Sequence, residues 1–243
     1  MLDQIGTIVL MTAIIVNFGA VAVAMGGSLV WRISFLMIAG LWTGFAVVLA
    51  AGGALLGNTG LVGPVPPIGV VVLTPLVAVA VALVLSPALR RMLLALPTDL
   101  LIGLNTIRII GVFFLLLVAQ GRLGGPFPQS AGWGDIATGV AAPLVVLLLI
   151  IRAHRGAPVI ARVWNGFGAL DLVAAVALGA MSADGAPLQV FHTGIAGPLP
   201  VQSLPWSLIP TVLVPFWLVL HGIIHVQLRR GTTSFPRLHL AGA

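Results

Sequence analysis

The chain has 243 residues, of which 60% are hydrophobic and only 7% are charged. Soluble domains carry about 25% charged residues, so this composition excludes an ordinary soluble protein and indicates one that crosses a membrane several times. The 11 basic residues are all arginines, the 5 acidic residues are all aspartates, and the formal net charge is +6. Because the arginines lie beside apolar runs, they favour anionic membrane lipids as partners and not nucleic acid.

Two missing residue types exclude several kinds of chemistry. Without lysine, the protein cannot form the Schiff base of a retinal protein. Without cysteine, it has no disulfide, thiolate metal site, iron–sulfur cluster or cysteine nucleophile.

Seven apolar runs have the length that an α-helix needs to cross a hydrocarbon core about 30 Å thick. They predict helices over residues 5–25, 33–56, 68–85, 100–120, 133–151, 159–181 and 205–228. No basic residue precedes the first run, so we interpret it as a membrane helix and not as a signal peptide. The stretch 87–98 is too short to span and predicts an interfacial segment. We therefore expect an all-α integral membrane protein, with one membrane domain over residues 1–243 and a bundle of seven transmembrane helices.

The arginines predict the orientation of this bundle. The loops after the first, third and fifth helices, together with the tail, hold nine of them, whereas the other loops hold only Arg122. The nine are Arg32, Arg90, Arg91, Arg152, Arg155, Arg162, Arg229, Arg230 and Arg237. By the positive-inside rule, the N-terminus lies outside and the C-terminus in the cytoplasm.

Four short motifs lie in the second half of the chain. They are N-x-x-R-x-x-G at 105–111, AGWGD at 131–135, NGFGALDL at 165–172 and LIPTVLVPFWLVLH at 208–221. Together they resemble an uncharacterised family of small bacterial multi-pass inner-membrane proteins, over residues 97–228. The resemblance implies a location in the cell inner membrane and carries over no activity.

Arg108 is the most unusual residue of the predicted membrane helices. An arginine near the middle of such a helix costs from about 2.5 to more than 10 kcal/mol unless water or a counter-charge relieves it. At about 1.5 Å per residue, Asp171 lies roughly 5 Å from Arg108 along the membrane normal, and Asp135 roughly 13 Å. We predict that Arg108 pairs with Asp171 and does not contact Asp135.

The polar residues of the last four helices predict a binding site at one depth. Its candidate substrate-binding residues are Arg108, Asp171, His221, Asn105 and Asn165. Ionisable groups inside a membrane are usually functional. The alternative is a structural ion pair that fixes helix packing with the help of the two asparagines.

His221 and His225 are four residues apart and share a helix face, which is typical of a metal-binding pair. A third ligand would have to come from Asp171 or His192. Both histidines lie on one helix, whereas a transmembrane haem takes one from each of two helices. His225 alternatively reaches the interface, and the sequence assigns no cofactor.

Asp135 and Trp133 lie at the predicted start of the fifth helix. An aspartate in a first turn suits the positive helix end, and a tryptophan there suits the membrane interface. The functional alternative is a gate through which substrate enters.

Three classes of function remain open. We favour binding or transport of a small molecule with a polar or anionic head group, because Arg108 can contact such a group. The second is a membrane enzyme, or a subunit that carries a cofactor or metal and acts on a lipid, although no nucleophile motif or phosphate loop supports it. The third is an accessory subunit of a larger membrane complex. A homo-oligomer also remains open.

Overall fold

The computed structural model describes residues 1–56, 65–151, 157–183, 185–191 and 197–231, and every regular element in these ranges is helical. Seven spans are long and apolar enough to cross a membrane. A helix satisfies its own backbone polar groups, which hydrocarbon cannot do, so apolar runs of this length become helices. The predicted class, a helical membrane protein with seven spans, is confirmed.

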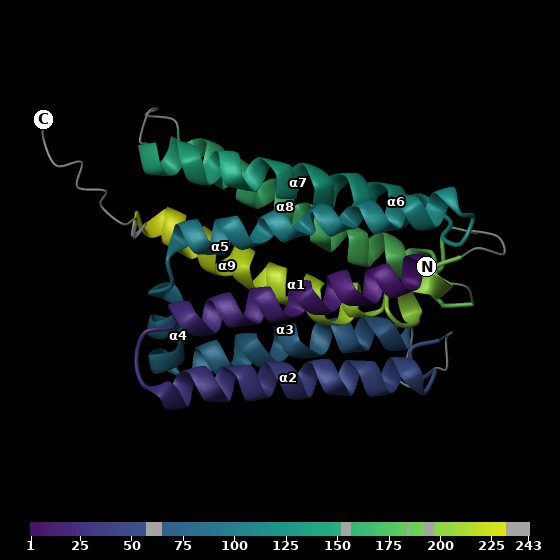
Figure 1. The fold of residues 1–243 in the computed structure, drawn as a ribbon, viewed down its shortest axis with the longest axis horizontal. Helices are drawn as coiled ribbons and strands as arrows, with labels where there is room; N and C mark the ends of the chain where they lie inside the picture. Colours follow the sequence, from purple (N-terminus) through teal and green to yellow (C-terminus); the bar gives the residue numbers. More distant parts are fainter. Residues whose placement is uncertain (57–64, 152–156, 184, 192–196, 232–243) are drawn as a thin grey trace, which may run out of the picture.

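The membrane-spanning helices lie side by side along the long axis of the molecule (Figure 1). The α-helices are α1 (Leu2–Ala24), α2 (Leu29–Ala51), α3 (Pro67–Leu85), α4 (Pro87–Leu94), α5 (Thr98–Leu104), α6 (Val112–Ala119), α7 (Pro126–Ile151), α8 (Ala157–Met181) and α9 (Val214–Arg230). Within the described residues there are also two 3-10 segments, η1 (Asn105–Gly111) and η3 (Leu199–Gln202), and one π-helical turn, η4 (Ile209–Leu213). The fourth span therefore consists of α5, η1 and α6, and the seventh of η4 and α9.

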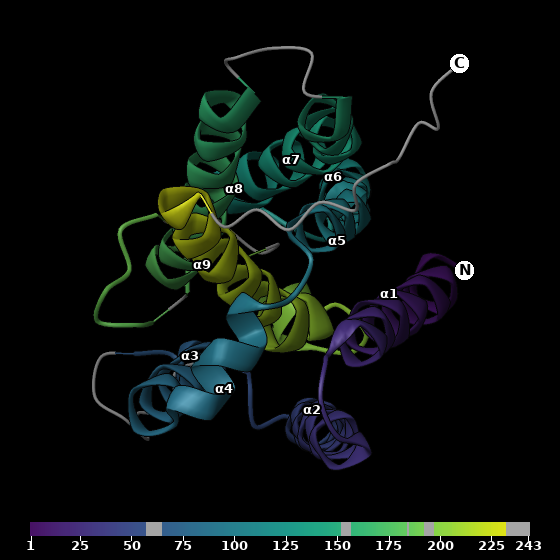
Figure 2. The ribbon, with the colours of Figure 1, turned by 90° about the vertical axis from the view of Figure 1, so that its left-hand side faces the viewer.

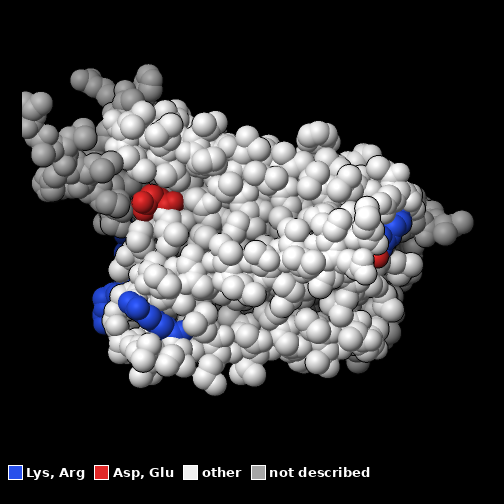
Figure 3. All heavy atoms as spheres, viewed as in Figure 1, with Lys and Arg blue, Asp and Glu red and all other residues white. Residues whose placement is uncertain are grey.

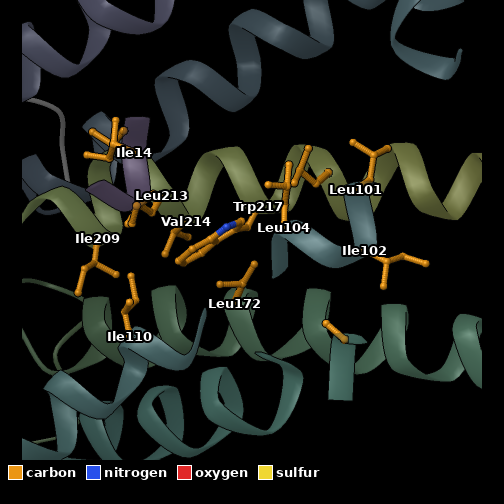
Figure 4. Packing of buried hydrophobic residues seen from close by; sticks show 14 of the residues in the cluster. Ile14, Leu101, Ile102, Leu104, Ile110, Leu172, Ile209, Leu213, Val214 and Trp217 are labelled. Atoms are coloured by element: carbon orange, nitrogen blue, oxygen red, sulfur yellow. The ribbon is translucent and has the colours of Figure 1, made fainter. Parts of the chain in front are cut away.

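The seventh span is the centre of the arrangement. In the end view, α9 lies between α5–α8 on one side and α2–α4 on the other (Figure 2). The fourth and seventh spans are the most buried of the seven, and the second and third are the least buried. Figure 4 shows how Trp217 of α9 packs among Leu104, Leu172 and Val214, which come from three spans. Arg108 of the fourth span and His221 of the seventh therefore lie in the two most buried spans.

The charged side chains that reach the surface of the described part of the molecule gather at its two ends. Figure 3 shows a broad uncharged band between them on the face in view. We call one end the Asp3 end, where Asp3 accepts hydrogen bonds from Arg122 (3.0 Å) and Trp206 (2.8 Å). The other is the α4 end, where Gln227 donates to the carbonyl oxygens of Leu94 and Leu96. These bonds attach the ends of the first and last spans to their neighbours.

Two helix boundaries differ from the prediction in ways that affect the site. The fifth span begins at Pro126, seven residues before the predicted start at 133. The fourth span is not a uniform α-helix, because its middle seven residues are wound as η1. The first of these differences moves Asp135 away from the helix end and into the membrane-spanning part.

Candidate functional site

The Arg108 side chain is the centre of a buried polar cluster. Its Nε donates to Asp135 Oδ1 at 2.7 Å, and its Nη2 donates to Asp171 Oδ2 at 2.6 Å. Arg108 is 0% exposed, and the side chains of Asp135 and Asp171 are only 4% and 7% exposed. The guanidinium is thus held between carboxylates of α7 and α8.

The predicted Arg108–Asp171 pair is confirmed, whereas the prediction that Asp135 does not contact Arg108 is wrong. The depth estimate failed because it placed the start of the helix too late. With α7 starting at Pro126, Asp135 is nine residues into the helix, or about 13 Å. Asp135 is therefore not in the first turn, and the helix-end account of this residue is also wrong.

His221 extends the cluster to α9. Arg108 Nη1 donates to the carbonyl oxygen of Gly168 and lies 3.0 Å from His221 Nε2. A guanidinium can only donate, so Nε2 must accept, and the imidazole proton lies on Nδ1. That Nδ1 lies 2.9 Å from Asn165 Oδ1 and donates to it, while Asn165 Nδ2 donates to the His221 carbonyl oxygen. The two residues thus form a reciprocal pair that fixes the ring and its tautomer.

The winding of η1 explains the N-x-x-R-x-x-G motif. A 3-10 helix has three residues per turn, so Asn105, Arg108 and Gly111 lie in one line on the same face. All three are buried. Asn105 does not bond to Arg108, because its Nδ2 donates to the Leu101 carbonyl oxygen at 2.9 Å.

Glycines allow the helices around Arg108 to approach closely. A Cβ on Gly111 would overlap Asp135, and a Cβ on Gly134 would overlap the Asp171 carboxylate. A Cβ on Gly168 would lie 2.6 Å from the His221 ring. These glycines come from three spans, and each leaves space for a polar member of the cluster.

Three further buried polar atoms around the cluster have no hydrogen-bond partner in the described part of the chain. They are Asn105 Oδ1, Thr138 Oγ1 and Trp217 Nε1. Each belongs to a residue one helical turn from Arg108, Asp135 or His221. Buried polar groups are nearly always bonded to protein or to water, so these atoms mark positions where a water or ligand atom can bond. The spacing of three or four residues along each helix was the available sequence signal for Thr138 and Trp217.

Trp133 and His225 lie apart from the cluster. Trp133 is 64% exposed, on the outside of α7, and His225 is also exposed. His225 is four residues from His221, but it lies on the exposed side of α9, whereas His221 lies among the buried residues of that helix. Neither residue therefore joins the buried network.

The geometry gives no support to a metal site at His221. Both ring nitrogens are engaged by Arg108 and Asn165, and a guanidinium beside Nε2 would repel a cation. Among the described residues, no group of three or more histidine, aspartate or glutamate side chains could hold a metal ion. His192, the alternative third ligand, lies outside the described residues.

Residues 65–229 match a family described as a domain of unknown function, DUF8737. The chain belongs to this family. The DUF8737 region begins before α3 and includes every residue of the Arg108 cluster, whereas α1 and α2 precede it. No curated protein and no solved structure matches the chain.

Proposed function

We propose that this protein binds and transports a small polar molecule, or a molecule with a polar head group, at the cluster of Arg108, Asp135, Asp171 and His221. The observation that carries the proposal is the convergence of these four side chains, from four spans, inside an otherwise apolar bundle. Ionisable groups at this depth are costly, and they are typical of substrate and ion pathways.

The charge of the cluster favours a ligand that donates hydrogen bonds or carries a positive charge. Two carboxylates surround one guanidinium, and His221 accepts a hydrogen bond as a neutral ring. Four of the five N–H groups that an arginine offers already bond to protein. An anionic head group would therefore compete with two aspartates for Arg108. The sequence alone favoured a polar or anionic head group, and the bonds of Arg108 favour the polar one.

A ligand screen with matched variants tests the proposal. The thermal stability of the purified protein in detergent is measured with small amines, amino acids, sugars, carboxylates and phosphate esters. We expect at least one compound to stabilise the wild type, because a ligand that binds only the folded state raises its stability. Asp171→Asn should abolish the effect. Asp99→Asn should keep it, because Asp99 lies on α5 outside the cluster.

Compounds that pass this screen are then tested for uptake into vesicles that contain the protein. Uptake by the wild type and by Asp99→Asn, but not by Asp171→Asn, is the expected result. The proposal is wrong if no compound stabilises the wild type, or if the two aspartate variants respond alike.

A further inference from the structure

A cavity lies beside the cluster, between α3, α7, α8 and the start of the seventh span. Its volume is about 80 Å³. This is space for roughly five to eight water molecules, or for a short alkyl chain. Among the described residues that line it, Asp135 is the one ionisable residue. The cavity therefore has mainly apolar walls, and one end of it reaches Asp135, which accepts a hydrogen bond from Arg108.

The cavity follows one face of each of two antiparallel helices. On α7 it passes from Asp135 to Ala131 and Phe127, in steps of four residues. On α8 it passes in the same direction from Leu172 to Val176 and Gly179. It therefore runs for about 12 Å from the cluster towards the Asp3 end. A molecule in it would have its polar end at Asp135 and its apolar part along the walls.

We infer that this cavity binds the alkyl chain of a single-chain amphiphile whose head group is an amine or another small cation. The inference rests on the proposed function, in that the head group binds at the same cluster. The shape and the apolar walls select the chain, since burial of apolar surface drives binding. The acidic groups of the cluster select the head group. An amine or ammonium head would donate hydrogen bonds to the Asp135 carboxyl group, whereas a carboxylate head would place a third acidic group beside Asp135 and Asp171.

Gly179 offers a way to fill the cavity without disturbing the helix. Among the described residues, a Cβ at this position would meet only Phe127, at an ordinary contact distance of 3.9 Å. Gly179→Leu should therefore fold normally and place its side chain in the space for the ligand. Gly166→Leu is the matched control, because Gly166 lies on the same helix, is exposed, and has no neighbouring atom within 4 Å of an added Cβ.

The experiment compares octylamine, octanoate and ethylamine as probes of the purified protein in neutral detergent. The dependence of thermal stability on probe concentration gives an apparent Kd for each. For the wild type, we expect octylamine to bind at least tenfold more tightly than either octanoate or ethylamine. Gly179→Leu should weaken octylamine at least tenfold and leave ethylamine unchanged. Gly166→Leu should match the wild type.

Ala175→Leu, four residues from Gly179 on the same cavity wall, provides a second blocking variant if Gly179→Leu does not fold.

The outcomes separate this inference from the proposed function. Equal binding of octylamine by the wild type and the blocked variants would overturn the chain site. The cluster would still be a binding site if Asp171→Asn abolished that binding. Equal binding of octylamine and octanoate would overturn the selection for a cationic head. If no probe binds and no compound of the wider screen does either, both proposals are wrong.

Discussion

Arg108 can lie inside the membrane-spanning bundle because its charge and its hydrogen bonds are satisfied from several directions. Asp135 and Asp171 supply opposite charges, and Gly168 and His221 supply neutral acceptors. The Arg108 guanidinium carbon also lies 5.9 Å from the centre of the Trp217 ring, at the outer limit of a cation–π contact. Each partner removes part of the cost of a buried charge, so the residues should be energetically coupled.

We predict that Arg108→Leu destabilises the protein more than Asp135→Leu or Asp171→Leu. Removing one partner of a buried ion pair costs about 3–5 kcal/mol in soluble proteins, and loss of the arginine leaves two carboxylates uncompensated. The triple variant should recover much of the loss, because all three charges are removed together. The double variant Arg108→Leu with Asp171→Leu should recover less, since Asp135 is left alone. Equilibrium unfolding in mixed detergent micelles measures these differences, and purely additive losses would contradict the coupling.

A second prediction concerns Gly134, whose added Cβ would overlap the Asp171 carboxylate. Gly134→Ala should displace that carboxylate and weaken its bond to Arg108, with a loss of about 1–3 kcal/mol, as is typical of overpacking. Gly166→Ala should be neutral or slightly stabilising, because nothing lies within 4 Å of the new Cβ and alanine favours a helix. Thermal unfolding in detergent compares the two. Equal effects would show that the space beside Asp171 is not limiting.

At the scale of elements, the contact between η1 and α7 decides where the charged residues meet. A 3-10 segment of seven residues is longer than is usual, and such segments often mark functional sites. Gly132 and Gly139 are seven residues apart and both face η1. A Cβ on Gly139 would lie 2.8 Å from the Ile109 backbone nitrogen, and one on Gly132 would lie 3.1 Å from the Gly111 carbonyl oxygen. Small residues allow backbones to approach closely in membranes, and here they bring α7 against η1.

We predict that Gly139→Ala separates α7 from η1, because the new Cβ meets backbone atoms that cannot rotate away. The expected result is a lower unfolding temperature and a weaker response to any ligand found in the screen. Gly103→Ala, in the preceding α5, is the control, since no atom lies within 4 Å of its added Cβ. A Gly139→Ala protein as stable as Gly103→Ala would mean that η1 and α7 can separate without cost.

At the scale of the whole molecule, the surface charges on the face shown in Figure 3 lie at two polar ends with an uncharged band between them, whereas the Arg108 cluster is buried inside the bundle. Arg90 and Arg91 lie on α4, Arg229 and Arg230 end α9, and Arg122 pairs with Asp3 at the opposite end. Three of the nine arginines used to predict the orientation, Arg152, Arg155 and Arg237, lie outside the described residues. The location in an inner membrane, the contact of the arginines with anionic lipids, and assembly into a homo-oligomer or larger complex remain predictions.

The predicted orientation can be tested with reporter fusions in a bacterial host. A reporter that is active only in the cytoplasm should be active when fused after Ala243. The same reporter inserted after Gly185, in the connection between the sixth and seventh spans, should be inactive. The opposite pattern at both positions would reverse the topology and place the α4 end outside.

The sequence by itself determined the class of the protein, its seven spans and the pairing of Arg108 with Asp171. These follow from local properties, because the length of an apolar run sets a span and an isolated charge requires a partner. Only the tertiary structure decided that Asp135 is the second partner, that His221 accepts from Arg108, and that η1 departs from the α-helix. The depth of Asp135 depends on where α7 begins, and Pro126 begins it inside a stretch that reads as a loop. The close contact of η1 with α7 depends on glycines of α7 that lie more than twenty residues later in the chain. Which segments meet, and how closely they pack, depends on parts of the chain that are far apart in the sequence, so the composition of the cluster is visible only once the helices are packed.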